Sequence, residues 1–232
     1  MIFYGVGVGP GDPDMVTVGA KKALDGADVV LVPVSSLGRM SLAGEIYSKL
    51  NPKKATHPFF FPMTEDASFR DKEILRQLDE YSALWENASS VALPVIGDAA
   101  LYSTAAYLYA VWRSLCPLLE LRLLPGVSAH SLAGCAAGEF LALGEERLAV
   151  LPGSADFSKL SETMAVSDCV ALYKPSALKG NLRELLSSTG PWKRAVRVHR
   201  AGLPGERVVT GGEALMPTDD YLSVLLLWRA RQ

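Results

Sequence analysis

Two glycine-containing turns are the stretches of this sequence best suited to holding a ligand. The first runs from Gly5 to Gly11 within "YGVGVGPGDPD", and the second is Gly97-Asp98, directly after an apolar run that ends at Ile96. Glycine has no Cβ, so its backbone groups can approach a ligand closely. Turns that follow the strands of a parallel sheet face one edge, where ligands bind. The two turns therefore predict a shared site.

The ligand of the first turn is not expected to carry a pyrophosphate. Dinucleotide sites need the pattern G-x-G-x-x-G, and in either register the last glycine is replaced, by Pro10 or by Asp12. Pro10 also lacks a backbone N–H, and Asp12 and Asp14 place negative charge where a phosphate would lie. The helix that follows is expected to begin only at Thr17, which can act as its N-cap. This turn therefore predicts close backbone contact without phosphate binding, while a plain tight turn remains the alternative.

The second turn is followed by polar side chains that have two interpretations. Asp98 could accept hydrogen bonds from a ligand, or it could cap the helix expected to start near Leu101. The next residues could point into a cleft, or they could satisfy the first turn of that helix. These residues are Tyr102, Ser103 and Thr104. The residue types alone leave both interpretations open.

The composition is that of a globular protein with no sign of a nucleic-acid or membrane partner. The 232 residues are 49% hydrophobic and 21% charged, with a formal net charge of −2. No apolar stretch approaches the length of a membrane span, and no basic segment precedes the first apolar run as in a signal peptide. The length allows one large domain or two small ones.

Cysteine and histidine usage predicts neither disulfides nor a protein-bound metal. The three cysteines are odd in number and lack metal-ligand spacing, which favours buried, reduced thiols in a cytoplasmic protein. The three histidines stand alone in the sequence, and none is assigned to a metal. The residues concerned are Cys116, Cys135, Cys169, His57, His130 and His199.

The pattern of apolar runs predicts two α/β domains, 1–125 and 126–232. In the first, continuous apolar strands alternate with helices, which is typical of a parallel sheet covered on both faces. In the second, the last three strands have no helices between them, which indicates antiparallel pairs and a mixed sheet. A ligand cleft is expected between the domains, at the carboxyl ends of the strands. Helices are expected at 17–26, 41–50, 65–86, 101–115, 127–138, 156–164 and 176–188.

The order and spacing of three segments resemble the tetrapyrrole methylase family almost from end to end. The segments are "YGVGVGPGDPDMVTVGAKKALDGADVVLVP", "GDAALYST" and "LPGVSAHSLAGCAAG". The resemblance implies an S-adenosylmethionine-dependent methyltransferase with two α/β domains. "FPMT", "YST" and "VSSLGRMSLAGEI" are more similar to one branch, whose members methylate precorrin-2 at C-20 in cobalamin synthesis. One departure is Ala99, where the family usually has Gly-Asp-Pro, and we expect a looser turn there.

The resemblance also implies which residues contact the methyl donor. In the first domain these are Pro10, Gly97, Asp98, Leu101, Tyr102, Ser103 and Thr104. In the second they are Val127, Ser128, Tyr173, Lys174, Ala201 and Gly202, although the last two pairs could equally be ordinary strand and turn residues. The donor carries no phosphate, which agrees with the interpretation of the first turn. A homodimer is also expected from the family.

The acceptor implied by the resemblance is a tetrapyrrole with many carboxylates, so an acidic chain must supply local cations. Arg39 is the first choice, because arginine binds a carboxylate bidentately. Asp98 and Tyr102 are the candidates for catalysis. The alternatives are methylation at another ring carbon, diphthine synthase, or a non-enzymatic nucleotide-binding regulator. Whether the acceptor is metal-free or holds cobalt stays open.

Overall fold

The computed structural model describes residues 1–34, 41–64 and 66–230. The chain divides into two compact units, unit 1 (Met1–Ser128) and unit 2 (Ala129–Gln232), each with its own sheet and core. The boundary expected between residues 125 and 126 falls just before this division.

Unit 1 is built on a parallel sheet with the strand order β3-β2-β4-β1-β5. Its strands are β1 (Ile2–Gly7), β2 (Val29–Val34), β3 (His57–Phe60), β4 (Ser90–Val95) and β5 (Glu120–Leu124). Its helices are η1 (Pro13–Met15), α1 (Val18–Gly26), α2 (Leu42–Leu50), α3 (Ala67–Glu80), α4 (Ser82–Trp85) and α5 (Thr104–Leu115).

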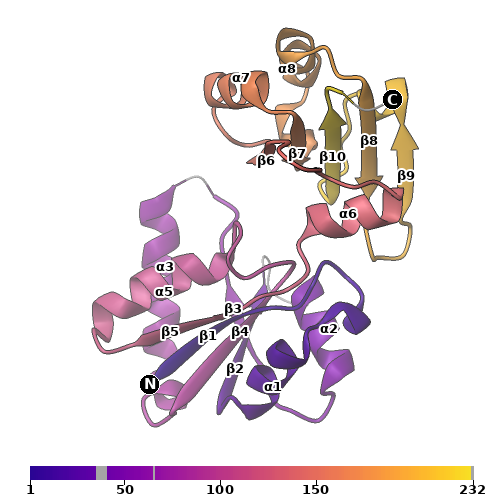
Figure 1. The fold of residues 1–232 in the computed structure, drawn as a ribbon. Helices are drawn as coiled ribbons and strands as arrows, with labels where there is room; N and C mark the ends of the chain where they lie inside the picture. Colours follow the sequence, from indigo (N-terminus) through magenta and orange to yellow (C-terminus); the bar gives the residue numbers. More distant parts are fainter. Residues whose placement is uncertain (35–40, 65, 231–232) are drawn as a thin grey trace. The chain divides into compact units, whose positions relative to one another are not determined.

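Helices cover both faces of the unit 1 sheet (Figure 1). On one face α1 and α2 pack on the strands, and Leu24 and Tyr47 are buried there. On the other face α3 and α5 bury Leu78 and Trp112 against Phe3 of β1. Buried parallel strands need this double cover, which is why their sequences are apolar without alternation. The parallel α/β expectation for this half is confirmed.

Unit 2 has a mixed sheet with the strand order β6-β7-β10-β8-β9. Only β6 and β7 pair in parallel, and the other three pairs are antiparallel, as expected from the late strands. Its strands are β6 (Leu148–Pro152), β7 (Cys169–Tyr173), β8 (Arg194–His199), β9 (Arg207–Thr210) and β10 (Ser223–Trp228). Its helices are α6 (Ala129–Ala137), α7 (Phe157–Val166), η2 (Pro175–Leu178), α8 (Asn181–Thr189) and α9 (Gly211–Ala214).

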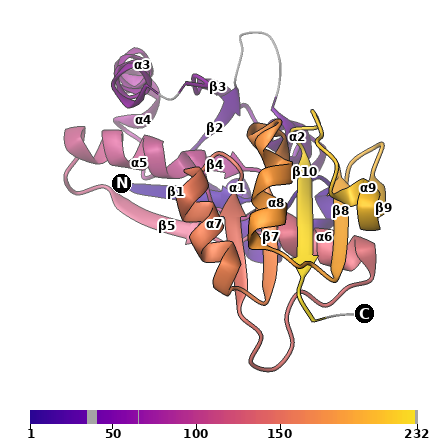
Figure 2. The ribbon, with the colours of Figure 1, turned by 90° about the horizontal axis from the view of Figure 1, so that it is seen from above.

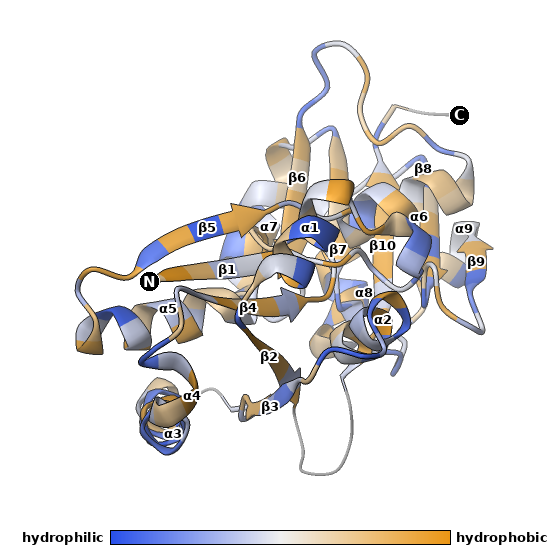
Figure 3. Cartoon of the chain, turned by 90° about the horizontal axis from the view of Figure 1, so that it is seen from below, coloured by the Kyte–Doolittle hydropathy of each residue, from blue (hydrophilic) through white to orange (hydrophobic). Residues whose placement is uncertain are grey.

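The unit 2 sheet is also covered on both faces. α7 and α8 lie side by side on one face, where Leu160 and Leu185 are buried (Figure 2). α6 covers the other face through Ala133, which packs in a core with Trp228. Figure 3 shows β6 coloured hydrophobic, whereas α3 of unit 1 carries both hydrophilic and hydrophobic residues.

Three helices differ from their expected extents for local reasons. The helix expected over 65–86 is interrupted at Tyr81, whose hydroxyl donates to the Pro58 carbonyl at 2.8 Å. The helix expected from Leu101 begins instead at Thr104, because Ser103 is its N-cap. The helix expected over 176–188 is split into η2 and α8 at Lys179, where φ is 48°.

The expectation about thiols is only partly met. The three cysteines are free, but Cys135 on α6 is exposed and Cys116 is half-buried, so only Cys169 is a buried thiol. Among the described residues, no helix is long and apolar enough to cross a membrane.

Candidate functional site

The structure brings the two glycine turns together at the carboxyl edge of the unit 1 sheet. β1 and β4 are neighbours, yet the helices that follow them, α1 and α5, pack on opposite faces. The connections after β1 and β4 therefore lead away from each other. The space between these two strand ends is a topological switch point, where parallel sheets bind ligands. Gly9 and Gly97 form a bridge across this point: Gly97 N–H donates to the Gly9 carbonyl at 2.7 Å, and Gly9 N–H returns the bond at 3.2 Å.

Three strand ends meet there through bare backbone. Gly7 ends β1, Gly126 follows β5, and Gly97 follows β4. A Cβ on Gly126 would lie 2.2 Å from the Gly97 oxygen and 2.7 Å from the Gly7 carbonyl carbon. No side chain fits in that space, so glycine is required by close packing and not only by a turn. We call the segments 8–17, 96–104 and 125–127 the unit 1 edge.

The first loop uses its acidic side chain locally and offers no phosphate cradle. Pro10 and Gly11 are buried, and Asp12 caps η1 by accepting from Asp14 N–H at 2.9 Å. Thr17 caps α1, as predicted, and its hydroxyl also donates to the Pro125 carbonyl at 3.4 Å. Because η1 separates β1 from α1, no helix N-terminus follows the strand directly, as a dinucleotide site would need.

The second loop places the two candidate catalytic residues at the same edge. Asp98 does not cap α5. Its Oδ1 instead accepts a hydrogen bond from Ala100 N–H at 2.7 Å within the turn. Tyr102 has φ 51°, a left-handed conformation that is costly for an aromatic residue and marks functional sites. Partial burial raises the pKa of Tyr102, so its hydroxyl stays protonated near neutral pH and can donate. Asp98 is therefore the better proton acceptor of the two.

The carboxyl ends of β6, β7 and β8 form a second edge, in unit 2. These three strands run in the same direction, since β7 and β8 are both antiparallel to the intervening β10. Two side-chain-bearing residues after these strands, Lys174 and Arg200, have φ 52°. Gly202, two residues further on, has φ 73°. We call Gly153, Lys174, 200–202 and Tyr221 the unit 2 edge.

Tyr221 is a member of this edge that the sequence did not single out. Its ring lies under the Lys174 ammonium, with Nζ 4.6 Å from the ring centroid. Lys174 N–H donates to the Ser223 carbonyl, and Arg200 N–H donates to the Leu222 carbonyl, so both cations flank the start of β10. The contact joins residues far apart in sequence, and no local motif signals it. Among the described residues neither Lys174 nor Arg200 forms an ion pair.

Two histidines that stand alone in the sequence have polar partners in the fold. His130 opens α6, and the Tyr173 hydroxyl accepts from its backbone N–H at 3.1 Å and lies 2.8 Å from its Nδ1. Tyr173 therefore holds the first turn of α6 through its hydroxyl. His199 contacts Asp220, at 2.9 Å. No cluster of three His, Cys, Asp or Glu that could hold a metal occurs in residues 1–34, 41–64 and 66–230.

The remaining predicted residues are distributed over the two units. Leu101, Ser103 and Thr104 are half-buried at the unit 1 edge, where Ser103 Oγ accepts from Ala105 N–H at 3.1 Å. Val127 and Ser128 are half-buried at the end of unit 1, and Ala201 and Gly202 are half-buried at the unit 2 edge. Arg39 lies outside the described residues.

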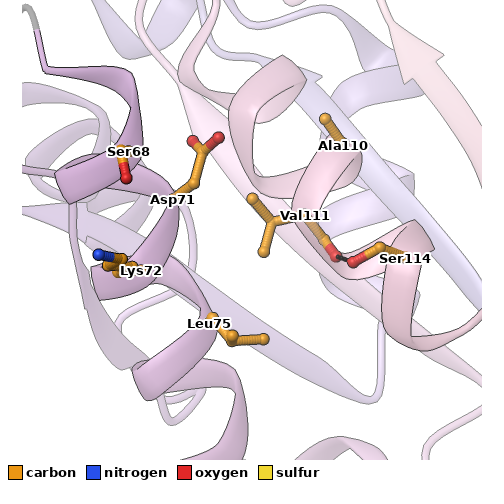
Figure 4. Close-up of a pocket in the computed structure, with 7 residues that line it drawn as sticks. All are labelled: Ser68, Asp71, Lys72, Leu75, Ala110, Val111 and Ser114. Atoms are coloured by element: carbon orange, nitrogen blue, oxygen red, sulfur yellow. Dashed lines mark hydrogen bonds between the residues drawn. The ribbon is translucent and has the colours of Figure 1, made fainter.

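A separate pocket of about 450 Å³ lies between α3 and α5 (Figure 4). Its α5 residues begin at Ala110, more than one turn beyond Thr104. Its lining mixes short apolar side chains with Asp71 and Lys72, and it includes none of the residues predicted to bind the donor. We therefore exclude this pocket and assign the candidate residues to the strand edge of each unit separately.

The sequence matches known proteins over nearly its whole length. The family model for Tetrapyrrole (Corrin/Porphyrin) Methylases matches residues 3–215. A probable cobalt-precorrin-2 C(20)-methyltransferase of Methanocaldococcus jannaschii is 32% identical, over 99% of this chain and 96% of that protein. The cobalamin biosynthesis protein CobIJ of Mycobacterium tuberculosis is 29% identical over 97% of this chain, but this chain spans only 45% of it, about half its length.

The fold is shared with solved structures of the same kind. Uroporphyrin-III C-methyl transferase from Thermus thermophilus, in complex with S-adenyl homocysteine, superposes with a TM-score of 0.69 at 20% identity, covering 98% of this chain and 91% of that one. With the family match, this makes the chain a member of the tetrapyrrole methylase family.

Proposed function

We propose that this chain is an S-adenosylmethionine-dependent methyltransferase that methylates precorrin-2, metal-free or cobalt-loaded, at C-20 in cobalamin biosynthesis. The observation that carries the proposal is the end-to-end match to a relative named for that reaction, at 32% identity. This chain corresponds to only about half of CobIJ, so the C-20 assignment is taken from the relative of matching length.

The unit 1 edge fits a methyl donor that has no phosphate. The backbones of Gly9, Gly97 and Gly126 pack closely at the switch point without side chains, and buried Pro10 offers no N–H to an anion. The carboxylates of Asp12 and Asp98 favour a cation at this edge. S-adenosylmethionine, when bound, supplies an electrophilic methyl group on a positively charged sulfur. The residues proposed to hold it are the donor contacts implied by the family resemblance.

The acceptor carbon is itself the nucleophile, so the chain needs no covalent intermediate. Its task is to hold donor and acceptor in line, which can supply much of the acceleration. Asp98 is proposed to take the proton that the acceptor carbon loses, and Tyr102 to orient the acceptor as a hydrogen-bond donor. Lys174, one of the donor contacts implied by the resemblance, and Arg200 are the cations of the unit 2 edge. Arg39 remains a proposed contact.

Donor binding is tested by calorimetry with S-adenosylhomocysteine and with NAD. We expect the demethylated donor to bind and NAD to bind far more weakly. Tighter binding of NAD would contradict the donor assignment. Transfer is tested by incubating the protein with S-adenosylmethionine and either metal-free or cobalt-loaded precorrin-2, followed by mass spectrometry. Gain of one methyl group by either acceptor supports the proposal and identifies the preferred form.

Two expectations about assembly and location are kept as proposals. We propose a cytoplasmic homodimer, since thin α/β domains with a small-residue helix such as α6 tend to bury apolar faces in a partner. Sedimentation equilibrium at micromolar concentration measures the oligomeric state directly. A monomer under those conditions would contradict it.

A further inference from the structure

His199 is the buried titratable group of unit 2 that the proposed reaction does not use. It is the last residue of β8 and is 2% exposed. Its Nδ1 lies 2.9 Å from Oδ2 of Asp220, and its Nε2 accepts a hydrogen bond from Arg197 Nε at 3.1 Å. Both ring nitrogens are thus paired inside the protein, directly before the Arg200–Gly202 turn.

The partners fix the charge and the tautomer of this imidazole. An arginine Nε always carries a proton and can only donate, so Nε2 of His199 must be the acceptor and carry no proton. The ring proton is then on Nδ1, where it is donated to Asp220. Arg207, whose guanidinium nitrogen is 3.4 Å from Nε2, adds a second positive charge on the same side. The Asp220 carboxylate faces Nδ1, but a proton on Nε2 would point at both guanidinium groups, so the hydrogen-bond geometry leaves Nε2 as an acceptor.

Arg197 is held firmly enough to impose this arrangement. It is 4% exposed, and its two terminal nitrogens donate to the carbonyls of Met216 and Glu213. Burial lowers the pKa of Arg197, and the nearby Arg207 charge lowers it further, but a guanidinium stays protonated in proteins. The Glu213 carboxylate lies 3.7 Å from Arg207 and balances part of the charge.

Asp220 passes this fixed orientation on to the unit 2 edge. While its Oδ2 accepts a hydrogen bond from His199 Nδ1–H, its Oδ1 accepts from Leu222 N–H at 3.0 Å. Its backbone carbonyl accepts from the Ser223 hydroxyl at 2.7 Å. Tyr221 stands between Asp220 and Leu222, and the Leu222 carbonyl accepts from Arg200 N–H at 2.6 Å. The segment carrying Tyr221 is thereby tied to the end of β8.

We propose that His199 is a positioning residue, which as a neutral Nδ1–H tautomer holds Asp220 and so sets where Tyr221 and the Arg200–Gly202 turn lie at the unit 2 edge. The proposal rests on the proposed methyl transfer for its catalytic consequence, but the tautomer and the placement of Tyr221 do not depend on it. His199 itself touches no reacting group.

The first test measures the tautomer in the unmodified, tag-free protein. The chain has three histidines, so ¹⁵N-imidazole NMR is tractable, with His199 assigned by loss of its signals in H199N. We expect a protonated Nδ1 and an unprotonated Nε2 at neutral pH. An Nε2–H tautomer or an imidazolium would overturn the proposal, whether or not the protein transfers a methyl group.

The second test separates positioning from stability. H199L removes both hydrogen bonds, whereas the H199N amide can still donate to Asp220 from near the Nδ1 position. We expect H199L to lower kcat for methyl transfer on the order of ten- to hundredfold, because small displacements cost this much. KM should change less, and H199N should recover most of kcat. Equal kcat for H199L and the wild type would overturn the proposal.

A matched control and a readout without catalysis complete the design. T189V removes a different buried hydrogen-bonding group of unit 2, the Thr189 hydroxyl at the end of α8, which donates to the Leu185 carbonyl at 2.6 Å. We expect it to lower Tm without changing kcat. A loss of kcat in T189V equal to that in H199L would make the effect merely structural.

In ¹³C-tyrosine NMR, with Tyr221 assigned through Y221F, its ring signals should move in H199L and stay near wild type in H199N. Unmoved Tyr221 signals in H199L would refute positioning even if the wild type showed no methyl transfer.

Discussion

The two strand edges of this protein differ in what lines them, which is closely packed glycine backbone in unit 1 and cationic side chains in unit 2. At the unit 1 edge the backbones of Gly7, Gly97 and Gly126 lie in direct contact, so recognition there depends on the absence of side chains. At the unit 2 edge, Lys174 and Arg200 have a positive backbone φ, which glycine would adopt without cost. Both positions nevertheless carry a long cationic side chain. The first edge is sensitive to added atoms, and the second to removed charge.

Adding one methyl group to the unit 1 edge should have the largest effect. In G126A the new Cβ would lie 2.2 Å from the Gly97 oxygen, so backbone must move. We expect a loss of about 3 kcal/mol or more in the free energy of unfolding and no measurable binding of S-adenosylhomocysteine. G26A is the matched control, because a Cβ there has no atom within 4 Å. Denaturant unfolding and calorimetry on both variants measure this, and equal behaviour of the two would contradict the account of a close-packed edge.

Removing the charge of Asp98 should have the next largest effect. In D98N the amide oxygen can still accept from Ala100 N–H, so the turn and donor affinity should persist. If the carboxylate accepts the displaced proton, kcat should fall on the order of a hundredfold. D98A also removes the hydrogen bond from Ala100 N–H within the turn and should therefore lower Tm. A D98N variant with wild-type kcat would exclude Asp98 as the base.

Substituting glycine for a left-handed lysine distinguishes function from strain at the unit 2 edge. K174G and K179G each replace a lysine at positive φ, 52° with ψ 53° at Lys174 and 48° with ψ −125° at Lys179. Lys179 is exposed and lies after η2, away from the strand ends. We expect K179G to gain about 1 kcal/mol in stability with unchanged methyl transfer. K174G loses its cation–π contact with Tyr221 and should lose roughly tenfold in kcat/KM. Wild-type kcat/KM in K174G would remove Lys174 from the site.

The sheet edges at the amino-terminal ends of the strands should matter least for activity, and their effect should be clearest on stability in acid. Both units tie neighbouring strands with an aspartate that precedes a strand: Asp28 accepts from Ser89 and Ser90 N–H, and Asp168 from Arg147 N–H. The Arg147 guanidinium lowers the pKa of Asp168 to about 2, from an ordinary 3.8. This contribution is therefore complete above about pH 4 and is lost as the pH falls toward 2.

The variant R147M tests this titration. It should flatten the fall in unfolding free energy between pH 4 and 2 and leave kcat unchanged. Urea unfolding at pH 2 to 5, beside kcat at neutral pH, measures both. A large loss of kcat would contradict the assignment of function to the opposite edge.

Local patterns predicted the elements well and the contacts between them poorly. Continuous apolar runs identified the strands, and Thr17 was recognisable as a cap because its partner is three residues away. Ser103 rather than Asp98 caps α5, a choice between two candidates in the same loop that propensity does not resolve. The position of Arg39 lies outside the described residues and stays a prediction.

The parts of the site that the sequence did not indicate depend on long-range pairing. The approach of Gly126 to Gly7 follows from β5 pairing beside β1, and the Lys174–Tyr221 contact from β10 lying beside β7. The contacts of His130 with Tyr173 and of His199 with Asp220 join residues that are far apart in the sequence. Strand order decides such contacts, and no short motif encodes it.

The reaction itself is tested most directly by the position of a labelled methyl group. The protein is incubated with S-adenosylmethionine carrying a ¹³C-methyl group and with precorrin-2 in its metal-free and cobalt forms, and the product is examined by ¹³C NMR. The account predicts one labelled methyl group, bonded to C-20, with at least one of the two acceptors. A labelled methyl group on another ring carbon, or no label in either product with protein that binds S-adenosylhomocysteine, would contradict it.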